Sequence, residues 1–290
     1  MSSIISSSRP VIILGMHRSG TSAVTRLLNI LGLELGPYLL QPSKDNEKGY
    51  WEHKDIVDLH DQVLATLGSS WCDTRPLPEG WQHREDISRL KQDISAVIER
   101  DFATSPLWGF KDPRTCRLLP LWHSIFEALG VRPSFVIVHR HPEEVAASLA
   151  RRDGFKREKS LLLWLEHILD AERLTRRHPR VFITFEQVLT DWRRTAMRIS
   201  DALGIVWPVA IESRAAEVEA FITPSLRHHN RAEPGGGDDL TWIGDAHAAM
   251  VNAAEDEGFD IIGRLDAVRR EFTAALGLFL SMAEDAAAHR

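Results

Sequence analysis

One short segment near the N-terminus constrains the fold of this 290-residue chain more than any other. Residues 11–14 form an unbroken apolar run, and residues 15–22 follow it as a loop that contains Gly15 and Gly20. Beyond the loop, apolar residues recur at the spacing of one helical face up to Leu31. Where a strand leads through a glycine loop into a helix, backbone N–H groups and the helix dipole can hold an anion. The sequence therefore predicts an anion-binding loop over residues 15–22.

Other apolar runs of similar length extend this pattern along the chain. They lie at residues 107–110, 135–138 and 181–183. Such runs are typical of a parallel sheet buried on both faces, although periodicity alone does not distinguish them from buried helical turns. Helical patterns occupy residues 59–67, 87–100, 118–129, 143–151, 160–176 and 192–203. We therefore predict a three-layer, P-loop-like α/β fold with a central parallel sheet flanked by helices, followed by a helical C-terminal tail.

Composition changes near residue 233. Residues 234–237 read Pro-Gly-Gly-Gly, and an alanine-rich helical pattern follows. Residues 233–290 carry twelve acidic and four basic residues, or −8, so the chain's −6 leaves +2 for residues 1–232. A nearly balanced main body lacks the basic stripe that nucleic-acid binding needs. We predict an α/β domain over residues 1–232, an acidic helical tail over 233–290 that packs on the core or continues it, and no nucleic-acid partner.

Cysteine content and the length of the apolar runs bear on the compartment. Cys72 and Cys116 are too few for a disulfide framework. The longest apolar stretches, such as residues 276–280, fall far short of the ~20 residues that cross a bilayer. The first ten residues show no basic n-region and no long apolar h-region of a signal peptide. These observations predict a cytoplasmic protein without a transmembrane segment, and they leave the oligomeric state open.

The glycine loop departs from the pattern of nucleotide triphosphatases. In that pattern a lysine follows the second glycine, but here Thr21 does, and the nearest cation is Arg18 inside the loop. Triphosphatases use the lysine on the β- and γ-phosphates and the next hydroxyl on magnesium. A P-loop kinase or nucleotide hydrolase is therefore a disfavoured alternative, which magnesium-dependent ATP turnover would identify.

Two segments resemble signatures of the sulfotransferases that use 3′-phosphoadenosine 5′-phosphosulfate (PAPS). The first signature is a basic residue followed by Ser/Thr-Gly-Thr, and it matches Arg18, Ser19, Gly20, Thr21 and Ser22. The second is an arginine that closes a strand with a serine eight residues later, and it matches Arg140 and Ser148. Residues 49–52, 109–114 and 184–189 look like the bacterial branch. The resemblance implies that the loop binds the donor, and that Arg140 and Ser148 hold its 3′-phosphate.

The resemblance also implies in-line transfer of the sulfuryl group to a hydroxyl or amine, without a metal. Charge builds on the oxygens of the transferred group, so positioned cations should dominate catalysis, and Arg18 and Lys111 are the candidates. A hydroxyl acceptor must lose a proton, and we predict Glu52 as the base, with His53 and His60 in reserve. Simpler roles stay open for two of them: a salt bridge for Lys111 and a surface charge for Glu52.

The sequence leaves the roles of several residues and the identity of the acceptor open. Arg227 and Arg231 either return to the donor, as a C-terminal basic segment does in other branches, or belong to a solvated turn. Trp71, in a loop over residues 68–80, belongs either to the wall of the acceptor site or to a packed connector. No Cys/His cluster indicates a zinc site. The acceptor is a glycan, lipid, peptide or small metabolite, unless the protein is a noncatalytic PAPS or nucleotide binder.

Overall fold

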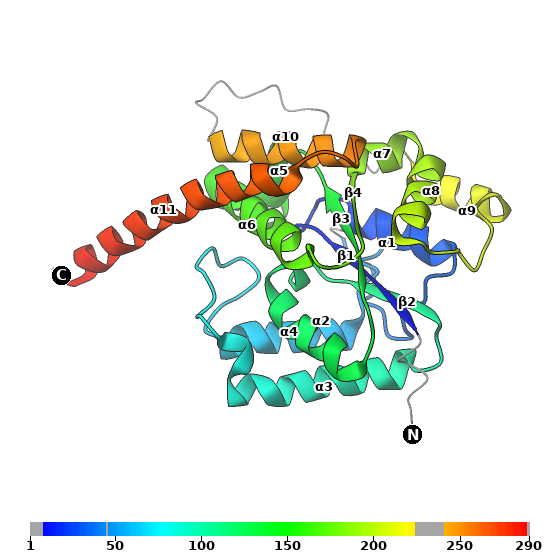
Figure 1. The fold of residues 1–290 in the computed structure, drawn as a ribbon, viewed down its shortest axis with the longest axis horizontal. Helices are drawn as coiled ribbons and strands as arrows, with labels where there is room; N and C mark the ends of the chain where they lie inside the picture. The colour runs from blue at the N-terminus through cyan, green and yellow to red at the C-terminus, as the bar shows by residue number, and fades with distance from the viewer. Residues whose placement is uncertain (1–7, 45, 224–240, 289–290) are drawn as a thin grey trace.

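The computed structural model describes the backbone of residues 8–44, 46–223 and 241–288 (Figure 1). Its centre is a sheet of four parallel strands in the order β2–β1–β3–β4. The strands are β1 (Arg9–Leu14), β2 (Leu107–Lys111), β3 (Ser134–His139) and β4 (Arg180–Thr184). Each strand contains one of the apolar runs, so the four predicted strands are confirmed.

Helices connect the strands and cover both faces of the sheet. Between β1 and β4 they are α1 (Thr21–Ile30), α2 (Lys54–Thr66), α3 (Glu85–Phe102), α4 (Thr115–Leu129), α5 (Pro142–Asp153) and α6 (Arg157–Thr175). After β4 they are α7 (Phe185–Thr190), α8 (Trp192–Leu203), α9 (Ala215–Phe221), α10 (Thr241–Glu255) and α11 (Ile261–Ala288). The pattern at residues 59–67 belongs to α2, which begins five residues earlier. The short helices α7 and α9 were not predicted.

Side chains along the strands alternate between two apolar cores. Ile12 and Ile137 face one core, which also contains side chains of α2 to α6, α10 and α11. Ile13 and Val136 face the other core, which contains side chains of α1, α7, α8 and α9. Fully burying an apolar side chain of this size contributes roughly 1.5–3 kcal/mol, so burial on both faces explains why the strands read as continuous apolar runs. The predicted three-layer α/β fold is confirmed.

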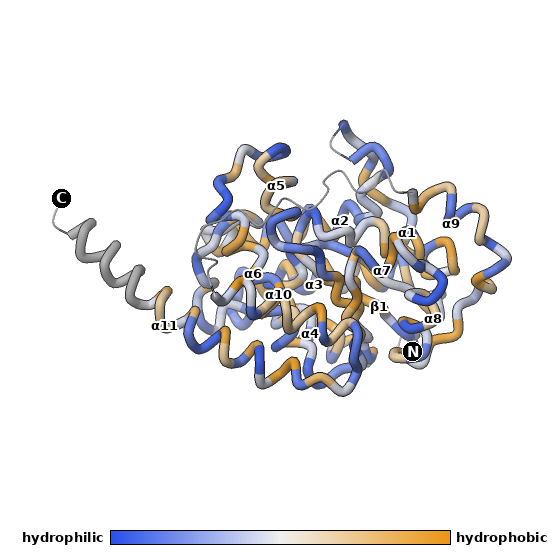
Figure 2. Tube along the Cα trace, turned by 90° about the horizontal axis from the view of Figure 1, so that it is seen from above, coloured by the Kyte–Doolittle hydropathy of each residue, from blue (hydrophilic) through white to orange (hydrophobic). Residues whose placement is uncertain are grey.

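The helix α10 packs along β4 and α6. Its buried face contains Ile243, Ala246, Ala249, Met250, Ala253 and Ala254. Helix α11 packs against α10 and α6 in its first half, and its second half runs away from the body of the protein (Figure 1). Figure 2 shows α10 beside α6 from a second side. The break predicted at residues 234–237 lies outside the described residues, and the domain boundary at residue 233 stays a prediction.

A buried histidine gives the fold a predictable pH dependence. Burial lowers the pKa of His167 on α6 to about 4, while its Nδ1 donates to the Leu163 carbonyl at 2.7 Å. The unfolded side chain takes up a proton near pH 6.5, so this contribution is complete above that pH and is lost as the pH falls toward 4. We expect the free energy of unfolding to fall by up to about 1.4 kcal/mol per pH unit from this group in that range.

Urea unfolding between pH 7 and pH 5 measures the effect. His167→Asn retains a donor for the Leu163 carbonyl but cannot titrate in this range, so its pH dependence should be shallower. An equally steep dependence in this variant would assign the proton uptake to other groups.

Candidate active site

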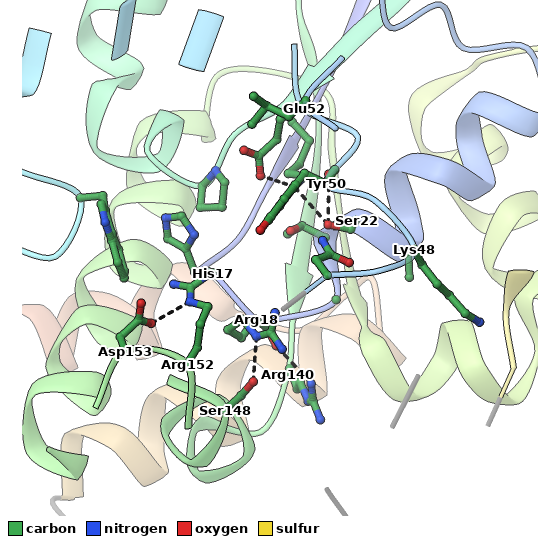
Figure 3. Close-up of a pocket in the computed structure, with 18 of the residues that line it drawn as sticks. His17, Arg18, Ser22, Lys48, Tyr50, Glu52, Arg140, Ser148, Arg152 and Asp153 are labelled. Atoms are coloured by element: carbon green, nitrogen blue, oxygen red, sulfur yellow. Dashed lines mark hydrogen bonds and ion pairs between the residues drawn. The ribbon is translucent and has the colours of Figure 1, made fainter. Parts of the chain in front are cut away.

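A cavity of about 960 Å³ opens where the four strands end (Figure 3). Its volume lies at the upper end of the range for ligand sites. Eight predicted site residues line it: Arg18, Gly20, Thr21, Ser22, Glu52, Lys111, Arg140 and Ser148. Ser19 does not line it, and its hydroxyl is buried without a hydrogen-bond partner. Arg227 and Arg231 lie outside the described residues.

The backbone of the glycine loop adopts positive φ values that residues with a side chain rarely adopt. Gly20, the N-cap of α1, has φ +87°, and an added Cβ would overlap the Phe185 ring. Arg18 has φ +68°, and of the described non-glycine residues only it and Trp51, beside Glu52, adopt positive φ. Strained backbone of this kind gathers at functional sites. The first turn of α1 has no side-chain cap and no acidic residue, so neither competes with an anion for the N-terminus of the helix.

The two signature segments meet in this cavity, although they are more than 100 residues apart. Nε of Arg18 donates to the Ser148 hydroxyl at 2.8 Å, and Nη1 of Arg140 donates to the Arg18 carbonyl at 3.2 Å (Figure 3). The loop after β1, the end of β3 and helix α5 therefore form one continuous wall. An anion that reached both arginines would compete with the Arg18–Ser148 hydrogen bond.

Arg140 is held from several sides but keeps one unpaired nitrogen. Its Nε donates to Glu144 at 2.8 Å, and its guanidinium lies over the Phe185 ring at 5.0 Å from the centroid. Its Nη2 is buried and has no hydrogen-bond partner. Unsatisfied buried donors are costly, so this atom indicates a site for an acceptor group of a ligand.

Glu52 and Lys111 form a buried ion pair in the cavity wall. Lys111 Nζ lies 2.5 Å from Glu52 Oε1 and donates to the Ser22 hydroxyl at 3.2 Å. Burial raises the pKa of Glu52, and the Lys111 ammonium opposes this effect without cancelling it. The salt bridge expected as the simpler role of Lys111 is present, but it is made inside the cavity and with the predicted base. A raised pKa makes the carboxylate a stronger base than a solvated glutamate.

The reserve histidines do not line the cavity. His60 is fully buried: Trp122 Nε1 donates to its Nε2 at 2.8 Å, and its Nδ1 lies 2.7 Å from Asp112. Its Nε2 is therefore an acceptor, and its Nδ1 carries the proton that Asp112 accepts. His53 Nε2 lies 3.0 Å from Asp101. The geometry favours Glu52 over both histidines because it alone of the three faces the cavity.

Other cavity residues were not assigned from the sequence. His17, inside the loop, packs on Trp71 with ring centroids 4.4 Å apart, and burial lowers its pKa well below the usual value. The Arg152 guanidinium also lies over the Trp71 ring, 5.1 Å from its centroid. Trp71 thus lines the cavity, as one of its two interpretations required. The position of His17 between the two loop glycines was the available signal for it.

Lys48 connects the cavity to the end of α9 and the residues just after it. It lines the cavity, and its Nζ donates to the Phe221 carbonyl at 2.7 Å and to the Thr223 hydroxyl at 2.8 Å. Thr223 is the last residue that the structure describes before residue 241. Lys48 therefore ties residues 221 and 223 to the cavity wall.

The part of the chain that the structure describes lacks two kinds of feature. Within residues 8–44, 46–223 and 241–288, no helix has the length and apolar character needed to cross a membrane. Among the described side chains, which end at residue 277, no three of His, Cys, Asp or Glu stand together as metal ligands would.

Comparison with known proteins gives one match by sequence and several by structure. The model of the sulfotransferase family matches residues 10–209. The sulfotransferase domain of the olefin synthase from Synechococcus PCC 7002 is similar, with 17% identity, a TM-score of 0.45, and coverage of 87% of this chain and 95% of that chain. The sulfotransferase domain from the curacin biosynthetic pathway has 14% identity, a TM-score of 0.43, and coverage of 92% and 98%. No curated protein matches by sequence.

The match to the family model includes the residues that build the cavity. Residues 10–209 contain the glycine loop, Glu52, Lys111, Arg140 and Ser148. The matched span is well over half of the chain, so the chain belongs to the sulfotransferase family, and the resemblance seen in its sequence is confirmed.

Proposed function

We propose that the protein transfers the sulfuryl group of PAPS to a hydroxyl or amine acceptor. The observation that carries the proposal is the meeting of both signatures in one cavity, through the contacts of Arg18 with Ser148 and of Arg140 with the Arg18 carbonyl. The buried Nη2 of Arg140, which has no hydrogen-bond partner, also fits an anionic nucleotide. A cytoplasmic location stays a prediction of the sequence.

The chain's own groups divide the binding of such a donor. Arg18 and the N–H groups of the loop would hold the phosphosulfate, because the N-terminus of α1 presents positive charge there. Arg140 and Ser148 would hold the 3′-phosphate, with Arg140 using the nitrogen that has no partner. The donor supplies a sulfuryl group whose bond to the bridging oxygen breaks as the bond to the acceptor forms.

The buried ion pair suits the chemistry that remains. Glu52 would take the proton of the acceptor, and its raised pKa suits that task. Lys111 touches both Glu52 and Ser22, so its ammonium lies between the base and the loop. There it can stabilise the negative charge that builds on the transferred group.

One contact favours sulfuryl transfer over a P-loop kinase or hydrolase. In those enzymes the hydroxyl at the start of the helix holds magnesium. Here the Ser22 hydroxyl accepts from the Lys111 ammonium and donates to the Tyr50 carbonyl at 3.1 Å. A cation already occupies the position that magnesium would need.

We expect 3′-phosphoadenosine 5′-phosphate (PAP), the desulfated donor, to stabilise the protein without magnesium. At a concentration 100 times its dissociation constant, it should add about 2.7 kcal/mol to the free energy of unfolding. Thermal melting with PAP, ADP and ATP–Mg²⁺ measures the effect. A preference for ATP–Mg²⁺ would contradict the proposal and favour a kinase or hydrolase.

Binding of PAP does not by itself establish transfer. Incubation of labelled PAPS with a broad panel of acceptors, followed by an untargeted search for sulfated products, tests that step. Binding with no transfer to any acceptor would favour a noncatalytic PAPS or nucleotide binder.

A further inference from the structure

The helix α10 contributes nothing to the lining of the cavity, yet it touches two elements that do. It comprises residues Thr241–Glu255 and lies beyond residues 10–209, which the family model matches. Its buried face packs on β4, α6 and α11. Its polar contacts reach a residue beside Arg140, the helix that carries Phe185, and Arg198 of α8.

His247 of α10 contacts the residues on both sides of Arg140. Its Nδ1 lies 2.8 Å from Nε2 of His139, the last residue of β3, so one of these nitrogens donates and the other accepts. Its ring also meets that of His141, the N-cap of α5, with centroids 4.5 Å apart. From α6, Trp164 Nε1 donates to the Arg140 carbonyl at 3.2 Å. The backbone at Arg140 is thus fixed between α6 and α10.

The other end of α10 supports the helix whose Phe185 ring lies against the Arg140 guanidinium. The Ala254 carbonyl accepts from Gln187 Nε2 at 2.8 Å. Gln187 also closes the capping box of α7 with Thr184, so α10 supports the start of the helix that carries Phe185. The Phe185 ring lies against Arg140 and blocks the Cβ position of Gly20.

We propose that His247 is a positioning residue for the donor site, which holds Arg140 ready for the 3′-phosphate through its contacts with His139 and His141. The inference rests on the proposed function for the identity of the ligand. Arg140 has few freedoms left: Glu144 fixes its Nε, the Arg18 carbonyl accepts from its Nη1, and its buried Nη2 points to no partner. A shift of the backbone at the end of β3 would move that nitrogen, and misplacement of a binding group is costly even when its chemistry is intact.

The test compares two substitutions at His247 with one elsewhere on α10. His247→Leu replaces the imidazole by an apolar side chain of similar size and so removes the hydrogen bond to His139. His247→Asn keeps a polar group near the position of Nδ1. Ala249→Gly lies on the buried face of the same helix and weakens α10 without touching any histidine.

Two measurements decide the role of His247. Calorimetry gives the ratio of the affinities for PAP and adenosine 5′-monophosphate, which isolates the 3′-phosphate. We expect His247→Leu to lower this ratio roughly tenfold, the size of one hydrogen bond, and His247→Asn to restore most of it. Hydrogen exchange without ligand should be faster at residues 141–148 in His247→Leu but not in Ala249→Gly.

Two results would overturn the positioning role of His247, and a third would overturn the proposed function instead. An unchanged ratio with unchanged exchange in His247→Leu would overturn the positioning role. Equal losses of both nucleotides in His247→Leu and Ala249→Gly would also overturn it, because that pattern indicates a general stabilising role of α10. If the unsubstituted protein bound neither nucleotide, the proposed function would fail, and exchange at residues 141–148 would still decide whether His247 holds this segment.

Discussion

Replacing Arg140 by alanine should erase the preference for a 3′-phosphorylated nucleotide. The guanidinium is buried, keeps one unpaired nitrogen and lies beside the glycine loop, so it is the cation best placed for that phosphate. A charge-assisted hydrogen bond contributes about 1.5–3 kcal/mol, which corresponds to roughly 10- to 150-fold in affinity. Calorimetry with PAP and adenosine 5′-monophosphate measures the preference directly.

Arg18→Ala provides the contrasting variant. Arg18 should act on the transferred group, so its loss should lower turnover by roughly 10²–10³-fold while sparing more of the 3′-phosphate preference. Arg132→Ala is the matched control. Arg132 is exposed and precedes the amino end of β3, whereas Arg140 follows its carboxyl end, where the cavity lies. An unchanged preference in Arg140→Ala would mean that the 3′-phosphate binds elsewhere.

The strands and the glycine loop could be predicted because their signals are local. An apolar run such as residues 11–14 is buried on both faces, so nothing along it interrupts the pattern. The glycine at residue 20 is required by its φ and by the Phe185 ring, so the loop pattern reflects a real steric limit. The meeting of Arg18 with Ser148 was predictable only through the resemblance, since no local rule connects residues 130 positions apart.

The direction of individual side chains was less predictable. His60 was a reserve base because it is near Glu52 in sequence, but it lies on the same helical face as Ile56, Val63 and Leu64 and points into the core. Its partner Asp112 comes from the end of β2, and such tertiary pairing leaves no local signal. The same holds for His247, whose contact with His139 joins residues 108 positions apart.

The short helix after β4 was also missed, although it contributes to the site. Helix α7 has six residues, too few for a helical period to be recognised. It nevertheless places Phe185 against both Gly20 and Arg140. In the loop over residues 68–80, by contrast, one of the two interpretations of Trp71 holds, because its side chain lines the cavity.

Glu52→Gln should reduce sulfuryl transfer by roughly 10²–10⁴-fold while leaving PAP affinity near normal. Glutamine retains the size and a hydrogen-bond acceptor for Lys111 but cannot take a proton from the acceptor substrate. The measurement is turnover of labelled PAPS with an acceptor found in the product search. Thermal melting must accompany it, because removing the charge of a buried ion pair can destabilise the protein by itself.

The pH dependence of turnover separates a base from a structural carboxylate at this position. Burial raises the pKa of Glu52, so activity that depends on its ionised form should be present above that pKa and lost as the pH falls through it. Glu52→Gln should lose this acidic limb, whereas Glu52→Asp should keep it at a reduced rate. Glu47 is an exposed glutamate that also lines the cavity. Glu47→Gln should therefore change neither the acidic limb of the pH profile nor the rate of transfer. Full turnover in a correctly folded Glu52→Gln protein would exclude Glu52 as the base, and His17 would then be the histidine to test, because it lines the cavity while His53 and His60 do not.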